Sequence, residues 1–214
     1  MNVISSWSGG KDSCYALMQI LKGDNNHEVI LNMMNENEKV SRSHGLPLNI
    51  LHQQANALGV SFVGIPSTWG DYEKNYIEAL YDIKAKFEVE AVVYGDIDLQ
   101  PHREWEEKVC KSAGLQALLP LWQQDRKQLV FDMIDSEIKA IIVSCNTTLG
   151  EAFLGREITK DIVDEFEKLG VDACGENGEY HTAVVDCPLF SKSVEVPPYK
   201  KAEYRNYCLS LIHI

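Results

Sequence analysis

The stretch of sequence that decides the fold is Ser8-Gly9-Gly10-Lys11-Asp12-Ser13. It follows a short apolar run at residues 3–7 and precedes a helix-like run at residues 14–21. This order predicts a strand, a tight glycine turn and the first turn of a helix. Two glycines let the backbone approach an anion closely, and the helix N-terminus adds partial positive charge. Because Lys11 adds a full charge and Ser8 and Ser13 add hydroxyl donors, the expected ligand is a polyphosphate.

The spacing of this 8–13 loop differs from the Walker A pattern, which needs four residues between its first glycine and its Gly-Lys pair. The alternative interpretation is a plain glycine turn that carries a solvated Lys11–Asp12 pair. The complete hexapeptide, placed directly after a first strand, favours the polyphosphate site.

The composition is that of an ordinary globular protein with an acidic balance. The 214 residues include 45% hydrophobic and 24% charged residues, and the formal net charge is −12. No apolar run reaches the roughly 18 residues of a membrane helix. No basic segment precedes the first apolar run, so we expect no signal peptide, no membrane association and a cytoplasmic protein. Affinity for nucleic acids comes mainly from basic residues that contact phosphates. Because this chain is strongly acidic, general nucleic-acid binding is not expected of it.

The first half of the chain alternates strand-like and helix-like segments. Strands are expected at residues 3–7, 28–34, 61–65 and 91–94, and helices at residues 13–21, 48–58, 72–87 and 103–113. This alternation predicts an α/β fold with a parallel sheet covered by helices, in which ligands bind at the carboxyl ends of the strands. A break near residues 120–124 predicts two domains, at residues 1–122 and 123–214. In the second we expect helices near residues 127–136 and 160–169 and a strand at residues 140–144.

Two further segments lie at expected strand ends. His44-Gly45 sits in a loop between a strand and a helix, where a surface role and a nucleotide contact are both open. Gly95-Asp96 ends a buried strand. Asp96 either holds Mg²⁺ through water, positions a substrate or caps the following turn, and these readings stay open.

A second polar glycine turn comes late in the chain, at Gly175-Glu176-Asn177-Gly178-Glu179-Tyr180-His181-Thr182. We refer to residues 175–182 as the 175–182 turn. One interpretation is a binding site, in which the two carboxylates recognise a cationic substrate or position an amine. The other is an exposed hairpin with solvated charges, which the residue types alone favour.

Residues 8–17, 104–121 and above all 174–190 resemble the diphthine–ammonia ligase family, also called the ATP-binding domain 4 family. The segment CGENGEYHTAVVDCPLF is similar to its C-terminal signature, and SGGKDSCYALMQ is similar to its loop. The loop also resembles that of the N-type ATP pyrophosphatases, which cleave ATP between the α and β phosphates.

The resemblance implies a Rossmann-like adenine nucleotide alpha hydrolase (HUP) domain at residues 1–122, which binds ATP. It also implies a smaller α+β domain at residues 123–214, which binds the substrate. The implied reaction adenylates a carboxylate and amidates it with ammonia, releasing AMP and pyrophosphate. The implied cofactors are ATP and Mg²⁺, and the acceptor is diphthine on elongation factor 2 or another carboxylate. A homodimer stays open.

The resemblance assigns roles residue by residue. The implied catalytic residues are Lys11, Asp12, Asp96 and Glu179, with Asp12 also the magnesium ligand. The implied ATP-binding residues are Ser8, Gly9, Gly10, Lys11, Asp12, Ser13, Met34, His44, Gly45 and Gly95. The implied substrate-binding residues are Glu176, Asn177, Gly178, Glu179, Tyr180, His181 and Thr182.

The chain differs from the family pattern where a substrate would be recognised. It carries Trp69-Gly70-Asp71-Tyr72 in place of an acidic segment, and His181 in place of an acidic residue. Two alternatives to the ligase are a sulfur-transferring tRNA-modifying enzyme and a non-enzymatic ATP-binding module. The first usually needs a cysteine pair, and none of the six cysteines forms a Cys-x-x-Cys pair. A non-enzymatic ATP-binding module would need neither the Lys11–Asp12 pair nor a second polar turn, and this chain has both.

Overall fold

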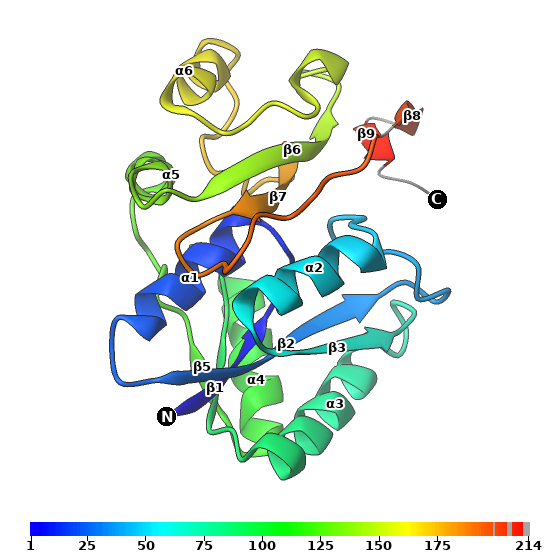
Figure 1. Ribbon diagram of the computed structural model, residues 1–214, viewed down its shortest axis with the longest axis vertical. Helices are drawn as coiled ribbons and strands as arrows, with labels where there is room; N and C mark the ends of the chain where they lie inside the picture. Colours follow the sequence, from blue (N-terminus) through cyan, green and yellow to red (C-terminus); the bar gives the residue numbers. More distant parts are fainter. Residues whose placement is uncertain (199, 205–206, 212–214) are drawn as a thin grey trace.

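The computed structural model describes residues 1–198, 200–204 and 207–211. Two sheets form the framework of the molecule (Figure 1). The first sheet is parallel, with the strand order β3-β2-β1-β4-β5. Its strands are β1 (Asn2–Ser6), β2 (Asn26–Met34), β3 (Ser61–Pro66), β4 (Ala91–Val93) and β5 (Gln116–Leu118). The expected parallel sheet is confirmed, and β5 is an addition that the sequence did not predict.

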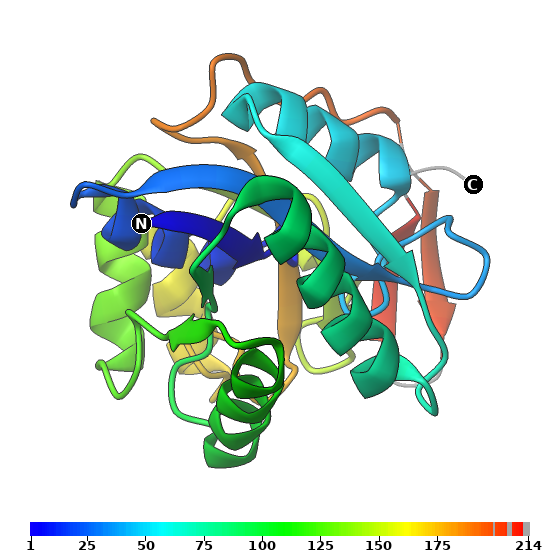
Figure 2. The same cartoon turned by 90° about the horizontal axis from the view of Figure 1, so that it is seen from below.

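Helices cover both faces of this sheet. They are α1 (Lys11–Leu21), α2 (Leu48–Leu58), α3 (Tyr72–Phe87) and α4 (Gln100–Ala113). Buried side chains of α1 and α2 share one hydrophobic cluster, and those of α3 and α4 share another. The view in Figure 2 shows α3 and α4 on the side of the sheet opposite α1. Both faces are therefore buried, which explains why the strands are continuous apolar runs.

The C-terminal part is built on an antiparallel sheet with the order β7-β6-β9-β8. Its elements are α5 (Arg126–Asp135), β6 (Lys139–Asn146), a 3₁₀ turn at Glu151–Phe153, α6 (Lys160–Lys168), β7 (Tyr180–Asp186), β8 (Lys200–Tyr204) and β9 (Tyr207–Leu211). The helices and strand expected here from the sequence are present. The α/β domain followed by a smaller α+β part matches the expected fold class.

The two sheets are joined by a shared core rather than by a thin contact. Side chains from α1, α2 and the second sheet belong to one buried cluster. The backbone N–H of Val184 on β7 donates to the carbonyl of Gly9 over 2.9 Å. The second sheet is therefore fixed against the turn between β1 and α1.

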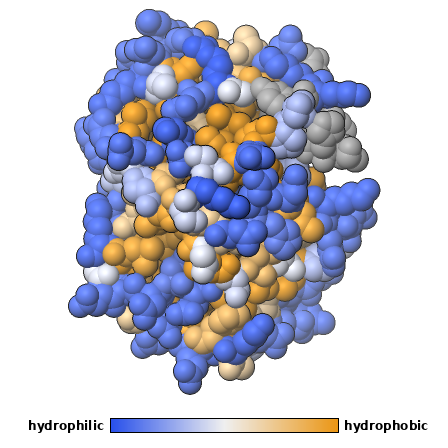
Figure 3. Space-filling model, viewed as in Figure 1, coloured by the Kyte–Doolittle hydropathy of each residue, from blue (hydrophilic) through white to orange (hydrophobic). Residues whose placement is uncertain are grey.

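The face drawn in Figure 3 carries hydrophilic residues around its outline and hydrophobic residues nearer its middle. Within the part of the chain that the structure describes, no helix combines the length and the apolar character needed to cross a bilayer.

Candidate functional site

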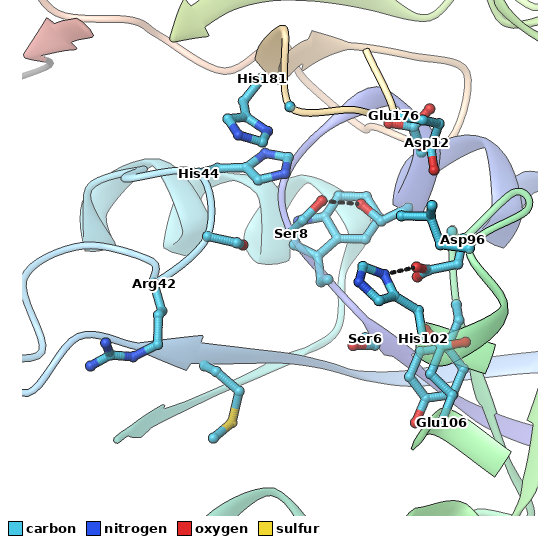
Figure 4. Close-up of a pocket in the computed structure, with 18 of the residues that line it drawn as sticks. Ser6, Ser8, Asp12, Arg42, His44, Asp96, His102, Glu106, Glu176 and His181 are labelled. Carbon is cyan, nitrogen blue, oxygen red and sulfur yellow. Dashed lines mark hydrogen bonds and ion pairs between the residues drawn. The ribbon is translucent and has the colours of Figure 1, made fainter. Parts of the chain in front are cut away.

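A cavity of about 670 Å³ opens between the carboxyl ends of the parallel strands and the 175–182 turn. The 8–13 loop forms its centre, with side chains from β2, α3, α4 and the loop before α2 around it (Figure 4). Parallel α/β sheets bind ligands at this edge, and the volume is that of a small-molecule site.

The 8–13 loop is shaped by close backbone packing. Gly9 has a φ of +86°, which only glycine adopts without strain. Gly95, at the end of β4, lies so close that a Cβ on it would stand 2.7 Å from the Ser13 nitrogen. The hydroxyls of Ser8 and Ser13 are 3.1 Å apart and both face the cavity. Loop hydroxyls and the N-terminus of α1 thus point to one place, as an anion site requires.

Lys11 lies at the start of α1 and is 3% exposed. Its Nζ donates to both carboxylate oxygens of Asp12, each over 2.9 Å, and to the carbonyl of Cys174 over 2.6 Å. It also lies 5.1 Å from the centre of the Tyr180 ring. Burial opposes the charge, but Asp12 and Tyr180 hold the pKa of Lys11 above its usual range. Lys11 is therefore a permanent cation that ties the 8–13 loop to the C-terminal part.

The 175–182 turn is held against the loop from the other side. The backbone N–H of Lys11 donates to Thr182 Oγ1 over 3.1 Å, and His44 Nδ1 donates to the Thr182 carbonyl over 3.2 Å. The rings of His44 and His181 lie 4.6 Å apart. Burial lowers the pKa of His44 to about 3 and that of His181 to about 4. Both imidazoles are therefore neutral at physiological pH.

Acidic side chains gather on the opposite side of the cavity. Burial, followed by the charge of Asp12, raises the pKa of Glu176 to about 7. Asp96 Oδ1 accepts from His102 Nδ1 over 2.7 Å. Burial and a hydrogen bond with Asp96 raise the pKa of Glu106 to about 11, so this carboxyl stays protonated at neutral pH.

The structure brings together most of the site residues expected from the sequence. The expected residues that line the cavity are Ser8, Lys11, Asp12, Ser13, His44, Gly95, Asp96, Glu176, Gly178, Tyr180, His181 and Thr182.

A smaller group of expected site residues lies outside the cavity lining, namely Gly9, Gly10, Met34, Gly45, Asn177 and Glu179. Met34 is buried beneath the sheet edge, and its neighbour Met33 reaches the cavity instead. Glu179 accepts from the backbone N–H of Asn177 over 3.0 Å and from its side-chain amide over 3.1 Å. Its carboxylate therefore closes its own turn, and Glu176 is the carboxylate of the turn that faces the cavity.

Several cavity residues were missed at the level of sequence. They are Asn32, Arg42 and Glu106. Trp69 and Tyr72, from the segment that the sequence placed where a substrate would be recognised, line the cavity as well. His102 is an exposed residue whose ring binds Asp96 at the cavity edge. Arg42 stands over the Trp69 ring at 5.1 Å and donates to the Ser67 carbonyl. Only the helical phase of α4 distinguishes Glu106 from its exposed neighbours Glu104 and Glu107, which is a weak signal in a run of polar residues.

The donor set for a metal ion is small. Among the described residues, no three His, Cys, Asp or Glu side chains are arranged to hold one. Asp12 belongs to the 8–13 loop and lines the cavity, and one or two carboxylates completed by substrate phosphates are a usual setting for Mg²⁺. The residues present therefore fit a phosphate-bound Mg²⁺ and not a metal held by protein alone.

Cysteine chemistry has little support in this cavity. All six cysteines are buried and reduced. Cys174 lines the cavity, but burial raises the pKa of its thiol well above the usual range. A reactive thiol needs the opposite shift.

Comparison with known proteins matches two family models to this chain. The diphthamide synthase N-terminal domain matches residues 1–117, and the diphthamide synthase C-terminal domain matches residues 125–213. A solved structure described as a predicted subunit of tRNA methyltransferase from Methanocaldococcus jannaschii DSM has a TM-score of 0.47 and 18% identity. The match covers 88% of this chain and 98% of that one.

Characterised relatives agree with the family models. The diphthine–ammonia ligase of Mus musculus is 33% identical over 222 residues, covering 92% of this chain and 83% of that protein. That of Homo sapiens is 32% identical with the same coverage. That of Schizosaccharomyces pombe is 29% identical, covering 95% of this chain and 37% of that longer protein. The chain therefore belongs to the diphthamide synthase family, that is, the diphthine–ammonia ligases.

Proposed function

We propose that this chain is an ATP-dependent ligase that converts the carboxylate of diphthine on elongation factor 2 into an amide, with ammonia as the nitrogen source. The observation that carries the proposal is the single cavity shared by the 8–13 loop and the 175–182 turn. An amide ligase that activates a carboxylate must hold the acceptor beside the nucleotide, and this cavity places a second polar turn there.

Two steps share the cavity. A carboxylate oxygen of the acceptor attacks the α-phosphorus of ATP, the bond to pyrophosphate breaks, and an acyl-adenylate forms. Ammonia then attacks the carbonyl carbon, and the bond to AMP breaks. The hydroxyls of Ser8 and Ser13 and the N-terminus of α1 hold the phosphates, while Lys11 offsets the charge that develops on pyrophosphate. Mg²⁺ held by Asp12 and the phosphates would add further charge neutralisation.

Residues 1–122 carry the ATP site in this proposal, and residues 123–214 supply the acceptor side through the 175–182 turn. His44 and Gly95 shape the nucleotide side, and Glu176, Tyr180 and His181 shape the acceptor side. The protein works in the cytosol, where elongation factor 2 is found.

The test is product analysis with ATP, ammonium and the diphthine form of elongation factor 2. We expect AMP, pyrophosphate and the amide in equal amounts. Elongation factor 2 that already carries the amide is the matched control and should give no AMP. ADP and orthophosphate as products would refute the proposed chemistry. AMP formation that is independent of the diphthine form would refute the proposed acceptor.

A further inference from the structure

Two neutral imidazoles and a guanidinium lie on one side of the cavity, and carboxylates lie on the other. His44, His181 and Arg42 lie on one side of it, whereas Asp12, Glu176 and Asp96 lie on the other (Figure 4). Carboxylates repel a triphosphate, so the acidic side is unsuited to a second anion unless a cation intervenes. Such a side is suited to a small cationic ligand.

Among the described residues, the basic side chains that face this side, Lys11, His102 and Arg126, are already paired with carboxylates. All three N–H donors of the Lys11 ammonium are already used, two by the Asp12 carboxylate and one by the Cys174 carbonyl. The charges of Asp12 and Asp96 add to burial in raising the pKa of Glu176, and Lys11 offsets them only in part. Glu176 therefore titrates near neutral pH, as a general base should.

Glu106 has a buried carboxyl oxygen without a hydrogen-bond partner among the described residues. It is 4% exposed and lines the cavity beside Asp96. Within the described residues, no donor reaches its buried Oε2. A buried carboxyl oxygen without a partner is costly and calls for a ligand that carries N–H or O–H groups.

Asp96 is kept ready to bind a cation. Burial opposes its charge, yet hydrogen bonds with His102 and Glu106 hold the pKa of Asp96 below its usual value. Each carboxylate oxygen accepts more than one hydrogen bond, so the contact with His102 leaves capacity for a ligand.

We propose that Asp96, Glu106 and Glu176 form the ammonium-binding site of this ligase, with Glu176 as the base that removes the first proton. This inference rests on the proposed function and names the place where its nitrogen donor is held. Ammonium donates N–H groups to Asp96 and Glu106 and transfers one proton to Glu176. The ammonia so formed attacks the acyl-adenylate, the C–N bond forms, AMP leaves, and the surplus proton on nitrogen is lost with AMP or to water.

The proposal has a definite pH dependence. Glu176 accepts a proton only when it is ionised, so ammonium-dependent turnover should rise as the pH passes upward through about 7. The other titratable or charged groups that face this site are Lys11, Asp12, Tyr72, His102, Glu107, Cys110 and Arg126.

The experiment compares Glu106→Leu and Glu176→Gln with wild type, using ammonium chloride as the probe and potassium chloride to keep the salt constant. Leucine is chosen at position 106 because glutamine would keep the carbonyl oxygen of the protonated carboxyl. Adenylation is followed separately, as acceptor-dependent exchange of pyrophosphate into ATP. For Glu106→Leu we expect KM for ammonium to rise roughly tenfold to hundredfold, the usual cost of losing a hydrogen bond to a charged group, with exchange unchanged. Glu104→Leu, exposed on the same helix, is the matched control and should behave as wild type.

Glu176→Gln provides the second arm, because this turn residue is less buried than Glu106 and its replacement should leave folding intact. It should abolish the rise in ammonium turnover near pH 7, and hydroxylamine, which is uncharged at neutral pH, should restore most of the rate. An unchanged KM for ammonium in Glu106→Leu would overturn the binding site. An equal loss with ammonium and hydroxylamine in Glu176→Gln would overturn the role as base. Absence of exchange in wild type would refute the proposed function instead.

Discussion

The 8–13 loop and the 175–182 turn are both glycine-rich and both face the same cavity, but they are held in place differently. The first joins β1 directly to α1, so its path follows largely from its neighbours in the chain, although Gly95 and Thr182 also contact it. The second depends on partners more than 130 residues away, as in the bonds of Thr182 with Lys11 and His44. A site can thus combine one part that local sequence determines with another that only tertiary packing positions.

The contact at Lys11 is the strongest link between these two segments. Lys11→Ala should lower turnover at least a hundredfold, because it leaves the partly buried Asp12 without its cation and removes the bond to Cys174. The free energy of unfolding should fall by about 3–5 kcal/mol, the usual cost of removing one partner of a buried ion pair. Urea unfolding and AMP release measure the two effects. Wild-type values for both would show that the link is dispensable.

Gly95 tests whether the loop needs its close backbone approach. In Gly95→Ala the new Cβ would meet the Ser13 nitrogen at 2.7 Å and the Asp12 carbonyl carbon at 2.8 Å, so the loop must shift. We expect ATP affinity to fall about tenfold or more, measured by calorimetry. Gly70→Ala is the control, since its Cβ would meet Thr68 Oγ1 at 3.6 Å, an ordinary contact. Equal ATP affinities in the two variants would show that the 8–13 loop does not need the close approach of Gly95.

Thr182 tests the anchoring of the second segment. Thr182→Val keeps the shape of the side chain but leaves the Lys11 backbone N–H without its acceptor. The free energy of unfolding should fall by about 1–3 kcal/mol, as for other buried groups left unsatisfied. A denaturation curve that superimposes on wild type would mean that the turn is held by other contacts.

Glu179 should give the smallest effect. Among the residues that the structure describes, its carboxylate accepts hydrogen bonds from Asn177 of its own turn. Glu179→Gln should therefore change turnover less than about threefold and stability by less than about 1 kcal/mol. Glu176→Gln, three residues earlier, is the comparison and should show a much larger loss of amide formation. A larger loss in Glu179→Gln would show that the turn rearranges when substrate binds.

Much of the parallel half could be predicted because its signals are local. The helices at 48–58 and 72–87 follow from apolar periodicity and end at left-handed residues, Gly59 and Glu88. The three-residue strand β5 was missed, since it is half-buried and too short to show a pattern. The edge strand β8 and its neighbour β9 were missed because their pairing, rather than their composition, defines them.

The site residues also fall into two groups, those that the sequence could locate and those that it could not. Ser8, Lys11, Gly95 and Asp96 lie at strand ends, and parallel topology alone brings such positions together. Glu106 and Arg42 carry no such signal. The first depends on which face of α4 is buried, and the second depends on the path of the loop between β2 and α2.

The central claim is that the 8–13 loop and the 175–182 turn hold ATP and a carboxylate together for adenylation. The most direct test uses diphthine whose carboxylate oxygens are labelled with ¹⁸O, incubated with the protein, ATP and ammonium. We predict that one labelled oxygen appears in the phosphate of AMP, because the acyl-adenylate transfers it when the amide forms. AMP without label, or label in orthophosphate released together with ADP, would contradict the account.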